Sequence, residues 1–323
     1  MTKRDVCSAV KRLSYLAATA VTAILSLLSS GSGFAAPVEK PNITFGVLPV
    51  TNVAVVYLSL KQGFFQEEGL NVTPRMMGTA SAVASIVGGD FDIADVTWAL
   101  FLLSINRGID LVAVSEGDRG QPGAAEFMVK ADSPIKTTAD LIGKKVGVVA
   151  IGGVCDYLLD DNLYRQGLDF RKVAYTPISP PDMPPTVLRG GLDAACFPEP
   201  ILSKLKEQGT MRSVMDLFGG PYDKTPIAGF VVTAQFAASY PNTVAALGRA
   251  LEKGLRFGNQ NPDKIREILP TYTTMKPEDA QKITMTYMPP GSDLTQVRRI
   301  ADIMKKIGAL PADAKIPAAI QGR

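Results

Sequence analysis

Between residues 42 and 115, short apolar segments alternate with longer helix-like segments, several of which end at glycine. The apolar segments predict strands at Asn42–Pro49, Val72–Met77, Asp92–Val96 and Leu111–Ser115. The segments between them predict helices at Val53–Glu68, Ala80–Val87 and Ala99–Arg107. Such alternation is typical of an α/β fold, in which a mainly parallel sheet is covered by helices on both faces.

The alternation restarts near residue 127 and later gives way to a helical ending. We expect strands at Phe127–Lys130, Val146–Val149, Val173–Pro177, Asp193–Phe197, Arg212–Met215 and Phe230–Thr233. The helices expected among them are Thr138–Ile142, Asp156–Gln166, a helix ending at Thr186–Arg189, and Ile201–Gln208. After Thr233 the pattern predicts helices at Asn242–Phe257, Pro262–Leu269, Pro277–Tyr287 and Leu294–Ile307.

One short sequence occurs in both halves of this pattern. Gly89-Asp-Phe-Asp-Ile-Ala and Gly190-Gly-Leu-Asp-Ala-Ala align position for position, and each closes a helix and begins a strand. Glycine and aspartate punctuate many α/β units, so the likeness is also explained without a repeat. We interpret it as two similar lobes, in which Asp92 and Asp193 are structural because they start strands.

The repeat also places a candidate site. Ligands of open parallel sheets bind at the carboxyl ends of the strands, so two lobes that face each other there form a cleft. The strand ends expected at this cleft are Leu48–Thr51, Gly78–Ser81, Thr97–Trp98 and Ser115–Gly117 in one lobe and Ala150–Gly153, Ile178–Ser179 and Phe197–Glu199 in the other.

The amino terminus has the pattern of a secretory signal peptide. Four basic residues precede an apolar run at about Leu16–Leu28, and small residues follow up to Ala36. We expect cleavage after Ala35, with an uncleaved membrane anchor as the alternative. Residues 1–35 carry a net charge of +3, which equals that of the whole chain, so the remainder is near neutral. No basic stretch with interleaved aromatic residues is present, so nucleic acid is not an expected partner.

Histidine and cysteine usage narrows the chemistry further. The chain has no His, which excludes Ser–His and Cys–His nucleophile pairs and removes the commonest metal ligand. We therefore expect no metal and no cofactor. Of the 3 Cys, Cys7 lies in the expected signal peptide, so Cys155 and Cys196 remain. In an oxidising compartment they form either a disulfide or two buried thiols, and their spacing does not decide between the two.

Three segments resemble a family of importer receptors for nitrate, sulfonates, taurine and thiamine-pyrimidine precursors. They are Val129–Val146 with its sequence Lys-Ala-Asp-Ser-Pro-Ile, Gly89–Val96, and Leu192–Pro200, which ends Cys-Phe-Pro-Glu-Pro. The resemblance covers about residues 42–260. It implies a two-lobed periplasmic-binding-protein fold of type II, whose chain crosses between the lobes twice, near Glu126–Lys130 and Ala228–Thr233. Lobe one would then comprise residues 36–127 and 232–323, and lobe two residues 128–231.

The expected cleft supplies the candidate ligand-binding residues. Thr51, Thr79 and Ser81 lie at helix starts, where free N–H groups favour polar acceptors, although ordinary capping explains them equally. Gly152 and Gly153 either present backbone N–H groups or form a tight turn. The remaining candidates lie at strand ends or in the next helix turn: Thr97, Trp98, the single tryptophan, as a stacking surface; Glu116 and Glu199 as acceptors for N–H groups; and Tyr157 through its hydroxyl.

These residues favour one kind of ligand over another. Simple anions are bound by donors, yet the expected cleft contains carboxylates and no Arg at a strand end. We therefore expect a small organic solute, zwitterionic or heterocyclic. As the resemblance implies, the protein would be periplasmic and would deliver this solute to an ABC permease and its ATPase. The alternatives are an enzyme on the same scaffold, such as a thiamine-pyrimidine synthase, and a sensing module without a transporter. The first is disfavoured by the absence of His.

Overall fold

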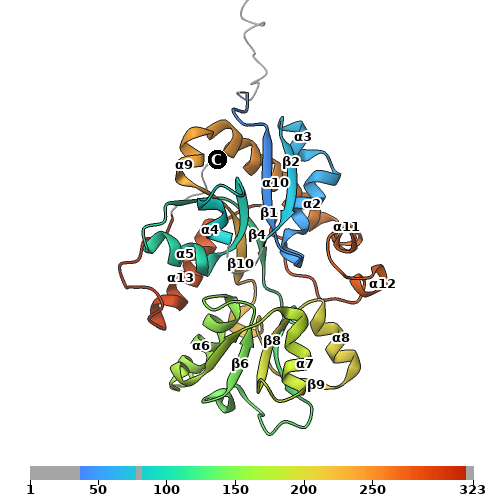
Figure 1. Cartoon of the computed structure of the whole chain (residues 1–323), viewed down its shortest axis with the longest axis vertical. Helices are drawn as coiled ribbons and strands as arrows, with labels where there is room; N and C mark the ends of the chain where they lie inside the picture. The colour runs from blue at the N-terminus through green and yellow to red at the C-terminus, as the bar shows by residue number, and fades with distance from the viewer. Residues whose placement is uncertain (1–36, 78–81, 318–323) are drawn as a thin grey trace, which may run out of the picture. The chain divides into compact units, whose positions relative to one another are not determined.

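The strands of the protein form two five-stranded sheets with the same topology (Figure 1). The computed structural model describes residues 37–77 and 82–317. The first sheet has the order β2 (Asn71–Met76), β1 (Asn42–Val47), β3 (Ile93–Thr97), β10 (Pro226–Thr233), β4 (Leu111–Arg119). The second has the order β7 (Ala174–Pro177), β6 (Lys145–Val148), β8 (Ala194–Pro198), β5 (Ala125–Lys130), β9 (Met211–Asp216). The α/β class and the two-lobe architecture are thus confirmed.

Each sheet is mixed rather than wholly parallel. β1 pairs in parallel with β2 and β3, whereas β10 pairs antiparallel with β3 and β4. In the second sheet β6 is parallel to β7 and β8, and β5 is antiparallel to β8 and β9. The antiparallel pairings are made by the strand that enters each sheet from the other one. Four strands of each sheet therefore run in the same direction and end at a common edge, and only β10 and β5 run the opposite way.

The chain passes between the sheets twice. It leaves the first sheet after Arg119 and enters the second at Ala125, then leaves the second after Asp216 and returns at Pro226. A further segment runs beside the first passage, because Arg119 and Tyr287 exchange two backbone hydrogen bonds of 2.8 Å each. The lobe boundaries expected from the sequence remain a proposal.

The helices follow the predicted segments with small differences. They are α2 (Ala54–Lys61), α3 (Phe64–Glu67), α4 (Ala82–Val87), α5 (Trp98–Asn106), α6 (Val154–Arg165), α7 (Met183–Leu188), α8 (Ile201–Gln208), α9 (Ala234–Ser239), α10 (Pro241–Gln260), α11 (Pro262–Ile268), α12 (Pro277–Ala280) and α13 (Val297–Lys306). One expected helix, Val53–Glu68, is split into α2 and α3. Gly63 lies between them with a φ of 77°, a backbone conformation that glycine adopts at little cost.

The helix expected at Pro277–Tyr287 is wrong. Only Pro277–Ala280 is helical, and the chain then extends past Tyr287. The Arg266 guanidinium donates to the carbonyls of Ala280 at 2.8 Å and Ile283 at 3.0 Å, which satisfies acceptors that a longer helix would have used. This tertiary contact ends the helix and leaves Thr284 and Thr286 free to approach the second sheet.

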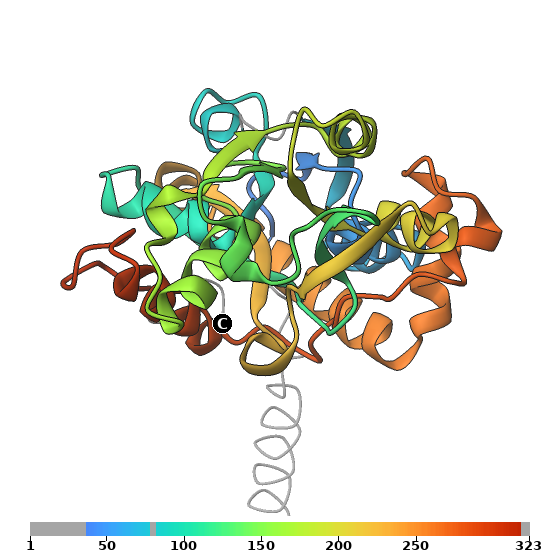
Figure 2. The same cartoon turned by 90° about the horizontal axis from the view of Figure 1, so that it is seen from below.

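Buried apolar residues hold helices on both faces of the sheets. On the first sheet, Phe45 and Phe230 pack edge to face at 5.2 Å and contact the core formed with α2 and α10. A second core includes residues of both sheets, among them Val96, Phe127 and Leu158. α13 contributes to this core and lies against α5 and α6, as Figures 1 and 2 show.

The repeated sequence has the same structural role in both sheets. Asp92 Oδ2 accepts the backbone N–H of Thr44 at 2.9 Å, and Asp193 Oδ2 accepts that of Lys145 at 2.8 Å. Each carboxylate therefore ties the residue before a strand to the strand beside it. The structural reading of both aspartates, and of the sequence repeat as two similar α/β units, is confirmed.

Candidate functional site

A cavity of about 180 Å³ lies between the two sheets, at the edge where β3, β6 and β8 end. The first sheet and its helices contribute Leu48, Val50, Thr51, Asn52, Asp95, Thr97, Asp118, Ile227 and Ala228. The second contributes Ala124, Ala125, Val149, Ala150, Gly153, Val154, Cys155, Pro198, Glu199, Leu217 and Phe218, and Thr286 comes from the C-terminal segment. Residues of both sheets thus meet where the sequence predicted a cleft.

Four of the candidate residues line this cavity: Thr51, Thr97, Gly153 and Glu199. Thr97 also caps α5, since its hydroxyl accepts the N–H of Leu100 at 3.3 Å. Thr51 begins the short 3-10 turn Thr51–Val53 that precedes α2. Gly153 immediately precedes α6 in extended conformation. Ligand contact by these residues remains a prediction, and their position in the cavity is consistent with it.

Glu199 is already engaged inside the protein. Its Oε2 accepts the backbone N–H of Ser203 at 3.1 Å, and its Oε1 accepts the Ser203 hydroxyl at 2.7 Å and the backbone N–H of Thr284 at 3.1 Å. A carboxylate offers about four lone-pair positions, so little capacity is left for a ligand. The Thr284 contact also links the second sheet to the C-terminal segment, which gives Glu199 a structural task at the cavity wall.

Three other candidates are buried outside the lining. Trp98 is fully buried, and its ring covers Gly229, where an added Cβ would lie 2.3 Å from the indole. Glu116 is engaged by Arg119, with N–O distances of 2.7 and 3.0 Å, and accepts the N–H of Asp293. Tyr157 is 3% exposed, and its hydroxyl has no partner within the described part of the chain. None of these three side chains lines the cavity.

The last candidates are a glycine and two positions outside the described residues. Gly152 has a φ of 79° and donates its N–H to Asp156 Oδ2, so this donor is used within the turn. Burial raises the pKa of Asp156 to about 6, against the hydrogen bonds from Gly152, Tyr157 and neighbouring backbone groups. Thr79 and Ser81, like the expected signal peptide, lie outside the described residues.

The sequence interpretation missed the carboxyl groups deepest in the cavity. Asp95 in β3 is 3% exposed, and Asp118 in β4 is 1% exposed. Asn52 Nδ2 donates to Asp95 Oδ1 at 2.8 Å, whereas Asp118 Oδ1 has no hydrogen-bond partner among the described residues. A usable signal was present, because both aspartates interrupt strands that are otherwise apolar or small.

Burial dominates the titration of these two groups. It raises the pKa of Asp95 to about 7, opposed by the hydrogen bond from Asn52. Burial also raises the pKa of Asp118 well above its ordinary value, and the nearby Asp95 and Glu116 carboxyls add to the rise while Thr286 opposes it. Removing an ionised carboxylate from water is costly, so burial disfavours the ionised form of both groups when no cation is beside them.

The wall opposite these carboxyls is apolar and contains a disulfide. Cys155 at the start of α6 and Cys196 in β8 are joined, which settles the alternative that the sequence left open. Val149, Ala150, Pro198, Leu217 and Phe218 complete this side. The cavity therefore has a polar side on the first sheet and a mainly apolar side on the second.

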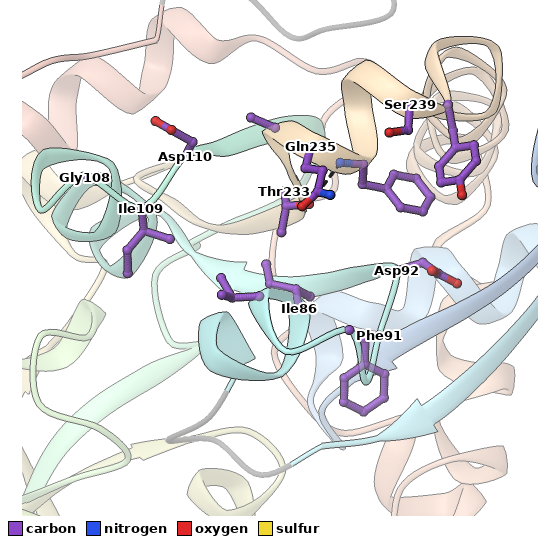
Figure 3. A pocket seen from close by; sticks show the side chains of 14 residues that line it. Ile86, Phe91, Asp92, Gly108, Ile109, Asp110, Thr233, Gln235 and Ser239 are labelled. Atoms are coloured by element: carbon purple, nitrogen blue, oxygen red, sulfur yellow. Dashed lines mark hydrogen bonds between the residues drawn. The ribbon is translucent and has the colours of Figure 1, made fainter.

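A larger and more open hollow, of about 620 Å³, lies at the opposite edge of the first sheet (Figure 3). The turns before β3 and β4 and the start of α9 form it, with Asp92, Asp110, Thr233 and Gln235 among its residues. Asp92 pairs there with Lys40, whose Nζ also lies 5.6 Å from the centre of the Phe236 ring. Because strands begin rather than end at this edge, apart from β10, it is a poorer candidate than the cavity between the sheets.

In residues 37–77 and 82–317 no three histidine, cysteine or carboxylate side chains are grouped as a metal site requires. None of the helices in that same part of the chain combines the length and apolar character needed to cross a membrane.

The comparisons with solved structures identify the fold. The alkanesulfonate-binding protein SsuA of Xanthomonas axonopodis pv. citri, bound to MOPS, superposes with a TM-score of 0.71 at 19% identity over 86% of this chain and 97% of that one. The nitrate-binding protein NrtA of Synechocystis PCC 6803 gives a TM-score of 0.70 at 16% identity over 85% of this chain and 84% of that one. At these identities the likeness establishes a shared fold.

Sequence comparison adds the family. A curated Escherichia coli (strain K12) protein named for binding aliphatic sulfonates is 35% identical over 109 residues, which are 34% of this chain and 34% of that protein. The match thus spans about a third of the relative's length. These relatives are named as binding proteins and not as enzymes, as the sequence predicted. The family model described as NMT1/THI5 like matches residues 50–265, so this chain belongs to the NMT1/THI5-like family.

Proposed function

We propose that this protein is an exported, periplasmic solute receptor. It binds a small organic molecule between its two lobes and delivers it to an ABC permease and ATPase. The main support for this proposal is the cavity between the sheets. Residues of both sheets line it, so a ligand there would contact both at once. Ligands that contact two lobes shift the population toward the closed arrangement, which a membrane partner can recognise.

The family membership and the amino-terminal pattern support export and import together. Solved structures with this fold include proteins named as periplasmic binding proteins for aliphatic sulphonate and for nitrate. The basic start, apolar run and small-residue exit of residues 1–35 are those of a secretory signal peptide. The disulfide between Cys155 and Cys196 fits an oxidising compartment. The relatives described above are named as binding proteins, so no catalytic role is proposed.

The lobes of this proposal are residues 36–127 with 232–323, and residues 128–231. The two passages between the sheets would serve as the hinge. The segment around Tyr287, which pairs with Arg119 at the first passage, would be a third connection. Ligand contacts are proposed for Thr51, Thr97 and Gly153, and for Glu199 only through the acceptor position that its three internal hydrogen bonds leave.

A thermal-shift screen of the protein purified from the periplasm of an expressing host tests the receptor function. The panel holds methanesulfonate, taurine, nitrate, amino acids, pyrimidines and aromatic amines, so that it spans all charge classes. A true ligand at about 100 times its dissociation constant adds about 2.7 kcal/mol to the free energy of unfolding, which raises the melting temperature by several degrees.

A variant that fills the cavity separates specific from general stabilisation. Ala150 lines the cavity, so Ala150→Trp should abolish the shift, while Ala84→Trp, at an exposed position of α4, should leave it unchanged. Small-angle scattering with the stabilising compound should show a smaller radius of gyration. If no compound stabilises the protein and mass spectrometry finds no small molecule released on denaturation, the receptor proposal fails.

A further inference from the structure

The two buried carboxyl groups in the cavity are placed by the sheet itself. β10 lies between β3 and β4, and its Phe230 pairs with Asp95 while its Ala228 pairs with Asp118. The two aspartates thus flank one central strand and line the same cavity. Their electrostatic interaction is repulsive when both are ionised.

These carboxyls differ from the other carboxyl groups nearby in having unmet hydrogen-bonding capacity. Glu116 is paired with Arg119 and Glu199 accepts three hydrogen bonds. Asp95, by contrast, accepts one side-chain hydrogen bond, from Asn52. Asp118 lines the cavity, and its buried Oδ1 accepts none within the described part of the chain, although the Thr286 side chain interacts with this carboxyl and lowers its pKa. A buried polar atom without a partner is rare in native proteins and points to a group that is supplied from outside.

The cavity offers no positive charge to compensate for them. In the described part of the chain, its lining contains no lysine and no arginine side chain. Arg119, next to Asp118 in sequence, is held by Glu116. A sulfonate or nitrate placed here would meet two carboxyl groups and lose its hydration without an ionic partner, which is costly in a buried site.

We propose that Asp95 and Asp118 together recognise a protonated nitrogen of the solute, so that this receptor takes small organic cations such as amines or amidines. The inference rests on the proposed receptor function. An N–H donor between the two carboxyls supplies the partner that Asp118 Oδ1 lacks, and its positive charge offsets their mutual repulsion. The apolar wall formed by Val149, Pro198 and Phe218 covers the rest of the molecule.

The size of the cavity limits the solute further. Its 180 Å³ is below the roughly 300 Å³ at which pockets for drug-sized ligands begin. A single ring or a short chain that carries one charged head group therefore fits better than a nucleoside or a peptide.

Isothermal titration of the full protein with matched single-ring probes tests this inference. Benzamidine, benzoate and benzenesulfonate share the ring and differ in the charge of the head group. We expect benzamidine to bind, and benzoate and benzenesulfonate not to bind. Asp118→Asn and Asp95→Asn should each weaken benzamidine about 10- to 100-fold, the loss typical of a hydrogen bond to a charged group. Asp90→Asn, at an exposed position, is the control of equal charge change and should bind as the wild type does.

The outcomes separate the recognition chemistry from the receptor function. If benzenesulfonate or benzoate binds more tightly than benzamidine, the inference is overturned and the receptor stands. The same holds if benzamidine binds both aspartate variants with wild-type affinity. A second single-ring cation, 4-aminopyridine, is titrated in the same way, and the inference is rejected if neither cation binds. In that case the receptor function is tested separately, and a small molecule released on denaturation supports it. Should either variant not fold, as judged by circular dichroism, the other variant carries the comparison.

Discussion

The two sheets share one topology and one pair of aspartate anchors, yet they present opposite chemistry to the cavity between them. In the repeat that aligns Asp92 with Asp193, Asp95 of β3 corresponds to Cys196 of β8. Each of these residues is joined to the start of the helix after the neighbouring strand. In the first sheet the link is a hydrogen bond from Asn52, and in the second it is a disulfide with Cys155.

Because of this difference, the two sheets have different roles at the cavity. The disulfide fixes an apolar wall covalently and needs no ligand. The Asn52–Asp95 link, with Asp118 beside it, leaves carboxyl capacity that a solute can use. We infer that the second sheet supplies shape and the first sheet supplies recognition.

The largest effect is expected from breaking the covalent link. Replacing Cys155 and Cys196 by serine removes a crosslink between residues 41 positions apart. In the chain-entropy model, a loop of that length corresponds to about 4 kcal/mol of the free energy of unfolding. Denaturation by urea measures this loss. Under conditions in which the double serine variant stays folded, its affinity for benzamidine should change little. A loss of affinity comparable to that of Asp118→Asn would show that the apolar wall takes part in recognition.

A smaller effect, with a defined pH dependence, is expected from the polar link. The pKa of Asp95 is about 7 in the folded protein, and an unfolded aspartate titrates near about 3.9. The folded state therefore binds the proton more tightly, so the contribution of Asp95 to stability is full below about pH 4 and is lost as the pH rises to about 7. Between about pH 5 and about pH 8 the expected loss without ligand is on the order of 3 kcal/mol.

Comparison with Asp95→Asn isolates this contribution. Asp118 and Tyr272 face Asp95, and Glu116 acts on Asp118, so their titration is present in both proteins and largely cancels in the difference. The unfolding free energy of the wild type, measured by chemical denaturation between about pH 5 and about pH 8, should fall more steeply than that of the variant. Parallel curves would mean that Asp95 is ionised throughout this range and that burial does not raise its pKa.

The smallest effect is expected at the two anchors. Asp92 accepts the N–H of Thr44 and pairs with Lys40, whereas Asp193 lies at an exposed position and accepts the N–H of Lys145. Asp92→Ala should cost about 1–2 kcal/mol and Asp193→Ala about 0.5–1 kcal/mol, because solvent screens the second hydrogen bond more. Thermal denaturation of both variants checks the order. A reversed order would show that the anchors are not equivalent.

Sequence patterns by themselves determined much of this fold. The apolar periodicity located nearly every strand to within a few residues, because a buried strand requires a continuous apolar segment whatever its partners are. The Gly-Asp repeat indicated two similar units, since the positive φ of Gly89 and Gly190 is a requirement of the local backbone. The bonds of Asp92 and Asp193 to the neighbouring strands depend on the tertiary structure. The same strand ends placed the cleft and, within it, Thr51, Thr97, Gly153 and Glu199.

Only the tertiary structure decided which polar side chains face that cleft. Trp98 and Glu116 lie near strand ends, yet packing against Gly229 and pairing with Arg119 turn them into the interior. Asp95 and Asp118 reach the same cavity because β10 returns from the second sheet and pairs with both of their strands. Each of these pairings joins residues more than a hundred positions apart in the chain. Local sequence carries no signal for such a contact, because the contact depends on which strands the complete chain brings side by side.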